Sequence, residues 1–244
     1  DEMTNLSKKM REVLDENFEI RAVTVAEKQV SSDKTIKSSF QLFDQNLVEG
    51  VLIPADDRMT ACVSSQVGCS LTCKFCATGY MDRKRNLDPA EIYDQVVRIR
   101  GQAEGHYQTP LTNIVYMGMG EPLLNYANVL QSIEHITSPE GLGMSPKRIT
   151  VSTAGIAKMI KKLGDDEVKF NLALSLHAAN DVKRNQIMPI NESNTLEALK
   201  EALQYFYKKT GSRITLEYIV FYRFNDTLED AKELWQFAKQ FPCK

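Results

Sequence analysis

The pattern of apolar and polar positions changes near residue 58 of the chain. In residues 4–17 apolar side chains recur every three or four positions, which predicts a short amphipathic helix. In residues 20–54 short apolar runs are separated by polar, turn-forming clusters, which predicts an antiparallel meander. We therefore expect residues 1–57 to form an N-terminal unit of one helix and a small antiparallel β extension.

From residue 58 onward the pattern alternates between strands and helices. The best-marked helix begins at Asp88, which is followed by a proline and then by a glutamate at the capping-box position. Such alternation predicts an α/β unit over 58–244, with parallel strands joined by crossover helices. Periodicity alone does not choose between a barrel and an open sheet. The expected strands cover 59–64, 113–117, 148–152, 169–175 and 213–220.

An unusual short stretch follows each expected strand. In parallel α/β proteins the carboxyl ends of the strands form the active face, so we expect the function at this edge. The last helix ends near 241–244 with no strand after it, which predicts an α/β unit cut before its last strand. The five stretches cover 69–76, 118–122, 152–155, 175–177 and 225–226.

Three of the five cysteines, Cys69, Cys73 and Cys76, lie within eight residues at C-x3-C-x2-C spacing. Thiolates bind soft metals and iron–sulfur clusters, and three of them would leave one iron of a 4Fe–4S cluster open. A zinc site completed by Cys62 is the main rival, although structural zinc usually needs two paired knuckles and only one is present. Burial of the three cysteines in an ordinary core is disfavoured by their polar neighbours.

Composition narrows the class of protein further. The 244 residues are 43% hydrophobic and 25% charged, and a formal net charge of −2 gives no bulk electrostatic case for binding nucleic acid. No apolar run approaches the length of a membrane span, and the charged N-terminus does not resemble a signal peptide. Clustered cysteines are typical of a reducing compartment. We expect a cytoplasmic protein, monomeric and without a membrane partner.

Six motifs, in their order and spacing, resemble those of the RlmN family of radical S-adenosylmethionine (SAM) enzymes. The resemblance runs from about Met3 to Lys244 and implies methylation of C2 of an adenosine in large-subunit rRNA and tRNA. The related Cfr family, which methylates C8, shares most of the motifs but typically has alanine where Pro122 stands, so C8 methylation is the alternative. The motifs cover 62–69, 69–76, 85–87, 118–125, 152–155 and 175–178.

The resemblance implies a partial (β/α)6 radical-SAM barrel that holds a 4Fe–4S cluster and SAM. Taken alone, each site residue also has an ordinary explanation as a turn, cap, core or surface residue. The implied cluster ligands are Cys69, Cys73 and Cys76. The implied SAM contacts are Gly120, Glu121, Ser152, Ser175, His177 and the backbone of Leu176. The implied catalytic residues are Cys62, which forms a transient disulfide, and Glu49, the general base.

Adenine C2 has no lone pair, so polar methyl transfer from SAM does not work there. The resemblance implies a route through a methylated cysteine, with rRNA, tRNA and an electron donor such as flavodoxin as partners. The family's methyl-carrying cysteine lies beyond residue 244 and its RNA-binding region precedes Asp1, so we expect the chain as given to bind both cofactors only partially and not to turn over. Two further classes of protein stay open, namely a radical-SAM enzyme with a small substrate and a zinc-stabilised binding module.

Overall fold

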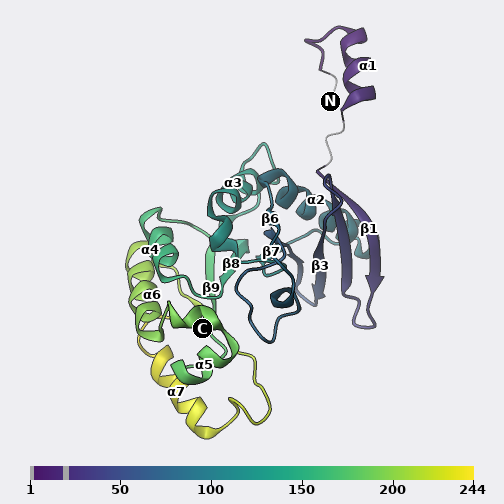
Figure 1. The fold of residues 1–244 in the computed structure, drawn as a ribbon. Helices are drawn as coiled ribbons and strands as arrows, with labels where there is room; N and C mark the ends of the chain where they lie inside the picture. The colour runs from purple at the N-terminus through teal and green to yellow at the C-terminus, as the bar shows by residue number, and fades with distance from the viewer. Residues whose placement is uncertain (1–2, 19–21) are drawn as a thin grey trace.

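The computed structural model describes residues 3–18 and 22–244 (Figure 1). The predicted N-terminal helix is α1 (Lys8–Asn17). Its N-cap is Ser7, whose side chain accepts a hydrogen bond from the backbone N–H of Met10 and so satisfies one of the free donors of the first turn. No residue of α1 is buried. The start of the predicted meander, at residues 20 and 21, lies outside the described residues.

The predicted antiparallel meander is present. It consists of β1 (Val23–Val30), β2 (Ile36–Leu42), β3 (Leu47–Ala55) and β4 (Arg58–Cys62), each antiparallel to the next. Every second residue of β2 is buried, as expected for strands with one face on a core. Because β4 also belongs to the parallel part, both parts share one sheet, and a division into two domains at residue 57 stays a prediction.

The rest of the sheet is parallel, which confirms the predicted α/β class. After β4 come β7 (Asn113–Tyr116), β8 (Ile149–Thr153), β9 (Asn171–Ser175) and β10 (Thr215–Glu217), each beside its predecessor. Every crossover thus steps in the same direction, which puts the helices on one face as in a barrel; a doubly wound sheet would reverse its order. The barrel is not closed. A separate two-stranded sheet pairs β5 (Gln66–Val67) with β6 (Arg85–Asn86).

Six helices follow α1 in the described part of the chain. The predicted capping box at Asp88 is present, and its backbone N–H donates to Glu91 Oε2 over 2.9 Å. No described helix is both long and apolar enough to cross a membrane. The helices are α2 (Pro89–Tyr107), α3 (Tyr126–Thr137), α4 (Ala157–Asp165), α5 (Asp181–Ile187), α6 (Leu196–Thr210) and α7 (Leu228–Ala238). The 3-10 turns are η1 (Ala77–Tyr80), η2 (Pro122–Asn125), η3 (Pro146–Arg148) and η4 (Pro189–Glu192).

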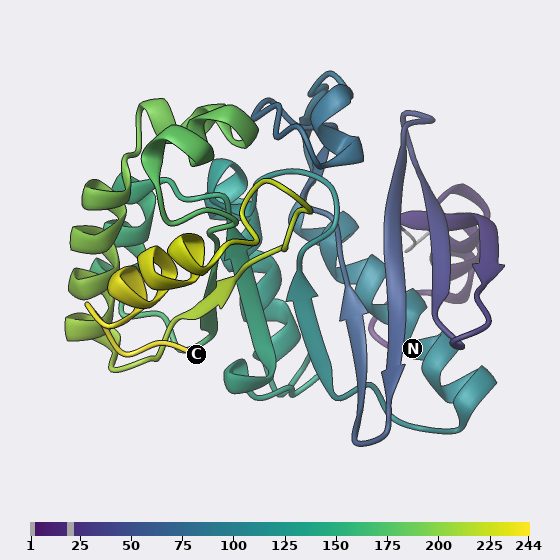
Figure 2. The ribbon, with the colours of Figure 1, turned by 90° about the horizontal axis from the view of Figure 1, so that it is seen from below.

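The parallel strands direct their carboxyl ends to one edge of the sheet. Figure 2 shows the cysteine loop in blue and the loop after β10 in yellow at this edge, although they are far apart in sequence. The last strand ends at Glu217, three residues before the predicted 220. The edge therefore carries Glu217 where we expected Asn225 and Asp226. At the C-terminus, Cys243 pairs in parallel with Ile214 beside β10.

Candidate active site

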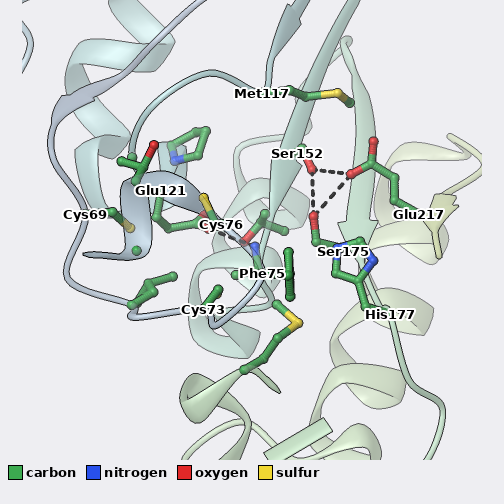
Figure 3. A pocket seen from close by; sticks show the side chains of 18 of the residues that line it. Cys69, Cys73, Phe75, Cys76, Met117, Glu121, Ser152, Ser175, His177 and Glu217 are labelled. Carbon is green, nitrogen blue, oxygen red and sulfur yellow. Dashed lines mark hydrogen bonds between the residues drawn. The ribbon is translucent and has the colours of Figure 1, made fainter. Parts of the chain in front are cut away.

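A cavity of about 350 Å³ lies at the carboxyl ends of β7, β8, β9 and β10 (Figure 3). A cavity of this size holds one small ligand. Eight of the predicted site residues line it, namely Cys69, Cys73, Cys76, Gly120, Glu121, Ser152, Ser175 and His177. Three predicted residues, Glu49, Cys62 and Leu176, do not.

The cysteine loop folds into consecutive turns that present three free thiols to the cavity. The backbone N–H of Cys76 donates to the Cys73 carbonyl over 3.1 Å, and the N–H of Gly79 donates to the Cys76 carbonyl over 2.9 Å. A Cβ on Gly79 would lie 2.5 Å from the Cys73 carbonyl oxygen, so the loop closes this tightly only with glycine there. Turn geometry thus sets the spacing of the thiols.

The donor set fits an iron–sulfur cluster. Burial, and secondarily the neighbouring thiols, raise the pKa of Cys73 to about 12, and burial likewise raises the pKa of Cys69. These groups are therefore thiols until a positively charged metal centre displaces their protons. A 4Fe–4S cluster takes each thiolate on a different iron, so three thiols from one loop can serve three of its irons.

Gly120 and Glu121 form the turn after β7. Gly120 has a φ of +93°, and a Cβ there would lie 2.4 Å from Cβ of Gln66, so both conformation and space require glycine. The Glu121 carboxylate accepts hydrogen bonds from the backbone N–H of Ala154 (2.7 Å) and of Leu123 (3.1 Å). Burial raises the pKa of this carboxyl group, and the two N–H donors oppose the rise. A cationic ligand beside this buried carboxyl group would favour its carboxylate form.

Ser152, Ser175 and Glu217 meet where three adjacent strands end (Figure 3). Glu217 Oε2 accepts hydrogen bonds from the hydroxyls of Ser152 (2.7 Å) and Ser175 (3.2 Å), and the two hydroxyl oxygens are 3.3 Å apart. Sequence reasoning missed Glu217, because the apolar run continues to residue 220 and concealed the end of β10. The position of this glutamate at a strand end was the signal that could have found it.

His177 follows β9 in a left-handed conformation, with a φ of +54°. Its Nδ1 accepts a hydrogen bond from the backbone N–H of Ile219 (3.1 Å), and its carbonyl accepts one from Nδ2 of Asn225 (2.6 Å). Its ring packs edge-on against Phe75 of the cysteine loop, with 4.6 Å between ring centroids. Burial, and then the positive charge of Arg184, lower the pKa of His177 to about 4, so the imidazole is neutral at pH 7.

Leu176 lies behind the cavity and is fully buried. Its backbone N–H donates to the Glu217 carbonyl over 2.9 Å. Its carbonyl accepts from the N–H of Ala178 and from Nε of Arg184. Both backbone polar groups are thus engaged within the protein. Similarly, Asn225 is 2% exposed, fastens the loop after β10, and does not line the cavity.

Cys62 and Glu49 lie outside the cavity but share one face of the sheet. Cys62 is paired with Val51 of β3, so Glu49, two residues from Val51, is its diagonal neighbour. Cys62 is also paired with Val115 of β7, and Met117, two residues further on, lines the cavity. Glu49 forms a 2.7 Å ion pair with Lys37, and about half of each side chain is exposed. Burial, followed by the charge of Glu217, raises the pKa of Cys62 to about 11.

A model of the Radical SAM superfamily matches residues 63–235, which include the whole cavity. A crystal structure of a radical SAM methyltransferase from Sphaerobacter thermophilus superimposes with a TM-score of 0.92 and 37% identity, over 99% of this chain and 71% of that protein. The fold and the cavity therefore define a radical-SAM enzyme, whose class uses SAM and a 4Fe–4S cluster.

Curated relatives specify the family. A protein from Cytophaga hutchinsonii, named "Probable dual-specificity RNA methyltransferase RlmN", is 72% identical over all 244 residues of this chain, which span 67% of the relative. A protein of the same name from Christiangramia forsetii is 60% identical over the whole chain and 69% of its own length. The chain belongs to the RlmN family and is a SAM-dependent RNA methyltransferase. It spans about two thirds of these relatives.

Proposed function

We propose that the chain is the catalytic part of an enzyme that methylates C2 of an adenosine in large-subunit rRNA and tRNA. The observation that carries the proposal is the meeting, in one cavity, of the cysteine loop with the polar residues that end β7, β8, β9 and β10. In this proposal Cys69, Cys73 and Cys76 each bind one iron of a 4Fe–4S cluster and leave the fourth iron for SAM. The bound cluster supplies the electron that cleaves SAM reductively.

The residues around the cavity have distinct proposed roles toward SAM. Glu121 binds the methionine ammonium group with its buried carboxylate, and Gly120 lets the chain approach the ligand closely. Ser152 and Ser175 offer hydroxyls whose orientation Glu217 fixes. The neutral imidazole of His177 packs beside the cysteine loop and excludes water from that side. Leu176 acts indirectly, through the backbone hydrogen bonds that hold the end of β9.

Cys62 and Glu49 are proposed to act in the later steps. Their shared sheet face leads from the cavity at Met117 to the antiparallel strands, so a substrate base placed against this face would reach both side chains. Cys62 would attack the sulfur that links protein to RNA, and Glu49 would take the C2 proton after leaving Lys37. Since burial raises the pKa of the Cys62 thiol, its thiolate must form in the substrate complex.

Exposed aromatic and basic side chains near the cavity support an RNA substrate. Tyr80, next to the cavity residue Gly79, is 78% exposed, and Tyr222 is 80% exposed with the guanidinium of Arg223 stacked 5.0 Å from its ring centroid. Aromatic faces and guanidinium planes are the groups on which unstacked RNA bases pack. An electron donor such as flavodoxin, a monomeric state and a cytoplasmic location remain predictions of the same proposal.

The test uses the protein extended to the length of its relatives and reconstituted anaerobically with iron and sulfide. It is incubated with SAM, a reductant and either an rRNA fragment or tRNA, and the nucleosides are analysed by mass spectrometry. We expect 2-methyladenosine in both RNAs. The exclusive appearance of 8-methyladenosine would favour the Cfr-like alternative, and the absence of methylated adenosine from both RNAs would contradict the proposal.

A further inference from the structure

Arg184 of α5 is a fully buried cation behind the cavity, with 0% of the residue exposed. Its guanidinium reaches the ends of two strands. Nη2 donates to the carbonyls of Ala154 (2.6 Å) and Ser175 (3.1 Å), and Nε donates to the carbonyl of Leu176 (3.1 Å). Nη1 donates to Oδ1 of Asn191 over 2.7 Å. The planar guanidinium thus acts as a fork of several N–H donors, and this fork fixes the ends of β8 and β9 relative to each other.

The charge of Arg184 has no carboxylate partner among residues 3–18 and 22–244. All four acceptors are neutral oxygens, and no described Asp or Glu oxygen lies within 4.0 Å of the guanidinium. Asp181, one turn earlier, instead accepts hydrogen bonds from Asn191 and Leu196. Burial lowers the pKa of Arg184 to about 10, so the side chain is still a cation at pH 7. An unpaired buried charge is costly, which raises the question of what it compensates.

The short helix α5 supports the cysteine loop as well as the strand ends. The Ile187 carbonyl at its C-terminus accepts a hydrogen bond from the backbone N–H of Lys74, between two of the cysteines, over 2.9 Å. Ala154 and Ser175, whose carbonyls accept hydrogen bonds from Nη2 of Arg184, both line the cavity, so the guanidinium lies directly behind it. Arg184 thus lies close enough to influence charge in the site.

We propose that Arg184 is a positioning residue that also serves as the buried counter-charge of the cluster and SAM site. The inference rests on the proposed cluster. Three thiolates make a 4Fe–4S cluster anionic, and one electron from an external donor adds a further negative charge without a proton. A fixed cation in a low-dielectric interior stabilises that extra charge. Arg184 should therefore raise the reduction potential of the cluster and strengthen the binding of the SAM carboxylate.

The experiment separates charge from shape with two variants of the extended, reconstituted protein. Arg184→Lys keeps the charge but loses the fork, and Arg184→Gln removes the charge but retains a donor. The matched control is Lys183→Gln on the same helix, where the lysine is paired with Asp230 and partly exposed. The readouts are iron content, the midpoint potential from a dithionite titration followed by electron paramagnetic resonance, and SAM affinity from calorimetry.

We expect Arg184→Gln to move the potential to a more negative value and to weaken SAM binding roughly tenfold. Arg184→Lys and Lys183→Gln should keep the potential of the unaltered protein. If Arg184→Gln does not fold, the midpoint potential of Arg184→Lys is the deciding measurement. A shift of that potential to a more negative value would overturn the inference, because this variant keeps the charge. An unshifted potential in fully loaded Arg184→Gln would also overturn it. Failure of the unaltered protein to take up a cluster would contradict the proposed function itself, and the inference with it.

Discussion

The antiparallel part of the sheet and the cavity edge of its parallel part place ionisable side chains in different surroundings. In the antiparallel part Lys37 and Glu49 pair at the surface, where about half of each side chain is exposed. In the parallel part Glu121 and Arg184 are 3% and 0% exposed, and neither has an oppositely charged partner among the described residues. The surface pair contributes about 0–1 kcal/mol to stability, whereas the buried charges are costly until a ligand compensates them. The buried Glu121 and Arg184, without ion-pair partners in the described part of the chain, thus lie at the cavity, whereas the buried Glu91 and Asp230 are paired with Arg85 and Lys183.

Left-handed backbone occurs in both parts of the sheet, but at different places. In the antiparallel part the left-handed residues Lys34 and Gln45 lie in hairpin turns, with φ of 70° and 65°. In the parallel part Gly120 and His177 are left-handed at strand ends that line the cavity. A histidine adopts this conformation only when its surroundings hold it there, and the hydrogen bonds from Ile219 and Asn225 do so. Two left-handed strand ends thus lie where a ligand would bind, while other left-handed residues, such as Gln108 and Glu167, lie outside the cavity.

The largest expected effect is on the cysteine loop. Replacing Cys69, Cys73 or Cys76 with alanine should abolish the brown chromophore of the reconstituted protein, because each thiolate binds a separate iron. The fold should persist, since none of the three is fully buried. Cys243→Ala, remote from the cavity, is the control and should retain the absorption. Zinc in equal amount to protein, with no iron, would contradict the assignment.

Cys62→Ala should stop turnover at a specific stage. In the protein extended to the length of its relatives, the variant should still assemble the cluster, because the other three cysteines hold it. It should then accumulate RNA attached to protein, because no thiolate remains to attack the linking sulfur. A denaturing gel with and without nuclease detects this species. Free methylated RNA at the normal rate would remove Cys62 from the mechanism, and loss of iron would make it a metal ligand.

Glu121→Gln should weaken SAM binding by about 1.5–3 kcal/mol, or roughly 10- to 150-fold, because it removes a charge-assisted hydrogen bond. Glu49→Gln, in the antiparallel part, is the control and should leave the affinity unchanged. Calorimetry on reconstituted protein measures both. An equal loss of SAM affinity in the two variants would contradict the placement of SAM beside Glu121.

The free energy of unfolding should fall as the solution becomes more acidic, because the buried imidazole of His177 resists protonation in the folded protein. Its folded-state pKa of about 4 lies below the ordinary value of 6.5, so its contribution is fully present above pH 6.5 and is lost as the pH falls toward 4. The loss is up to about 3 kcal/mol. Urea unfolding at several pH values, compared with His177→Gln, isolates this contribution. Identical pH dependence in the two proteins would show that the buried imidazole is not linked to stability.

The smallest expected effects compare two glycines. Gly120→Ala should cost about 1–3 kcal/mol, because the residue is left-handed and a Cβ there would lie 2.4 Å from Gln66. Gly101→Ala, in α2 with open space around it, should instead stabilise by about 0.5–1 kcal/mol. Thermal unfolding distinguishes the two. A neutral Gly120→Ala variant would show that the turn after β7 relaxes without strain.

The sequence predicted the features that depend on local pattern. The capping box at Asp88, the strand–helix alternation and the cysteine spacing each lie within a few neighbouring residues, and the structure contains all three. The resemblance to RlmN enzymes also indicated Gly120, Glu121, Ser152 and Ser175 as site residues, and all four line the cavity. Those residues could be predicted because each has a motif around it.

Arg184 and Glu217 could not be predicted in the same way. Arg184 lies in a helix of seven residues, too short for a periodic pattern, and its acceptors lie up to 30 residues away. The predicted end of β10, at residue 220, was wrong because Tyr218, Ile219 and Val220 continue the apolar run beyond Glu217. There the chain leaves the sheet because the Asn225 side chain binds the backbone of Ile219 and Phe221, a contact that apolar periodicity does not record. Glu49 lies outside the cavity, and its role stays a prediction.

We propose above all that three thiolates of this chain hold a 4Fe–4S cluster whose remaining iron binds SAM. The most direct test is the electron paramagnetic resonance spectrum of the anaerobically reconstituted and reduced protein, recorded before and after addition of SAM. We predict the signal of a reduced 4Fe–4S cluster that changes when SAM binds, and that in Glu121→Gln changes only at a higher SAM concentration. A signal that SAM leaves unchanged in the unaltered protein, or a protein that takes up zinc and no iron, would contradict the account.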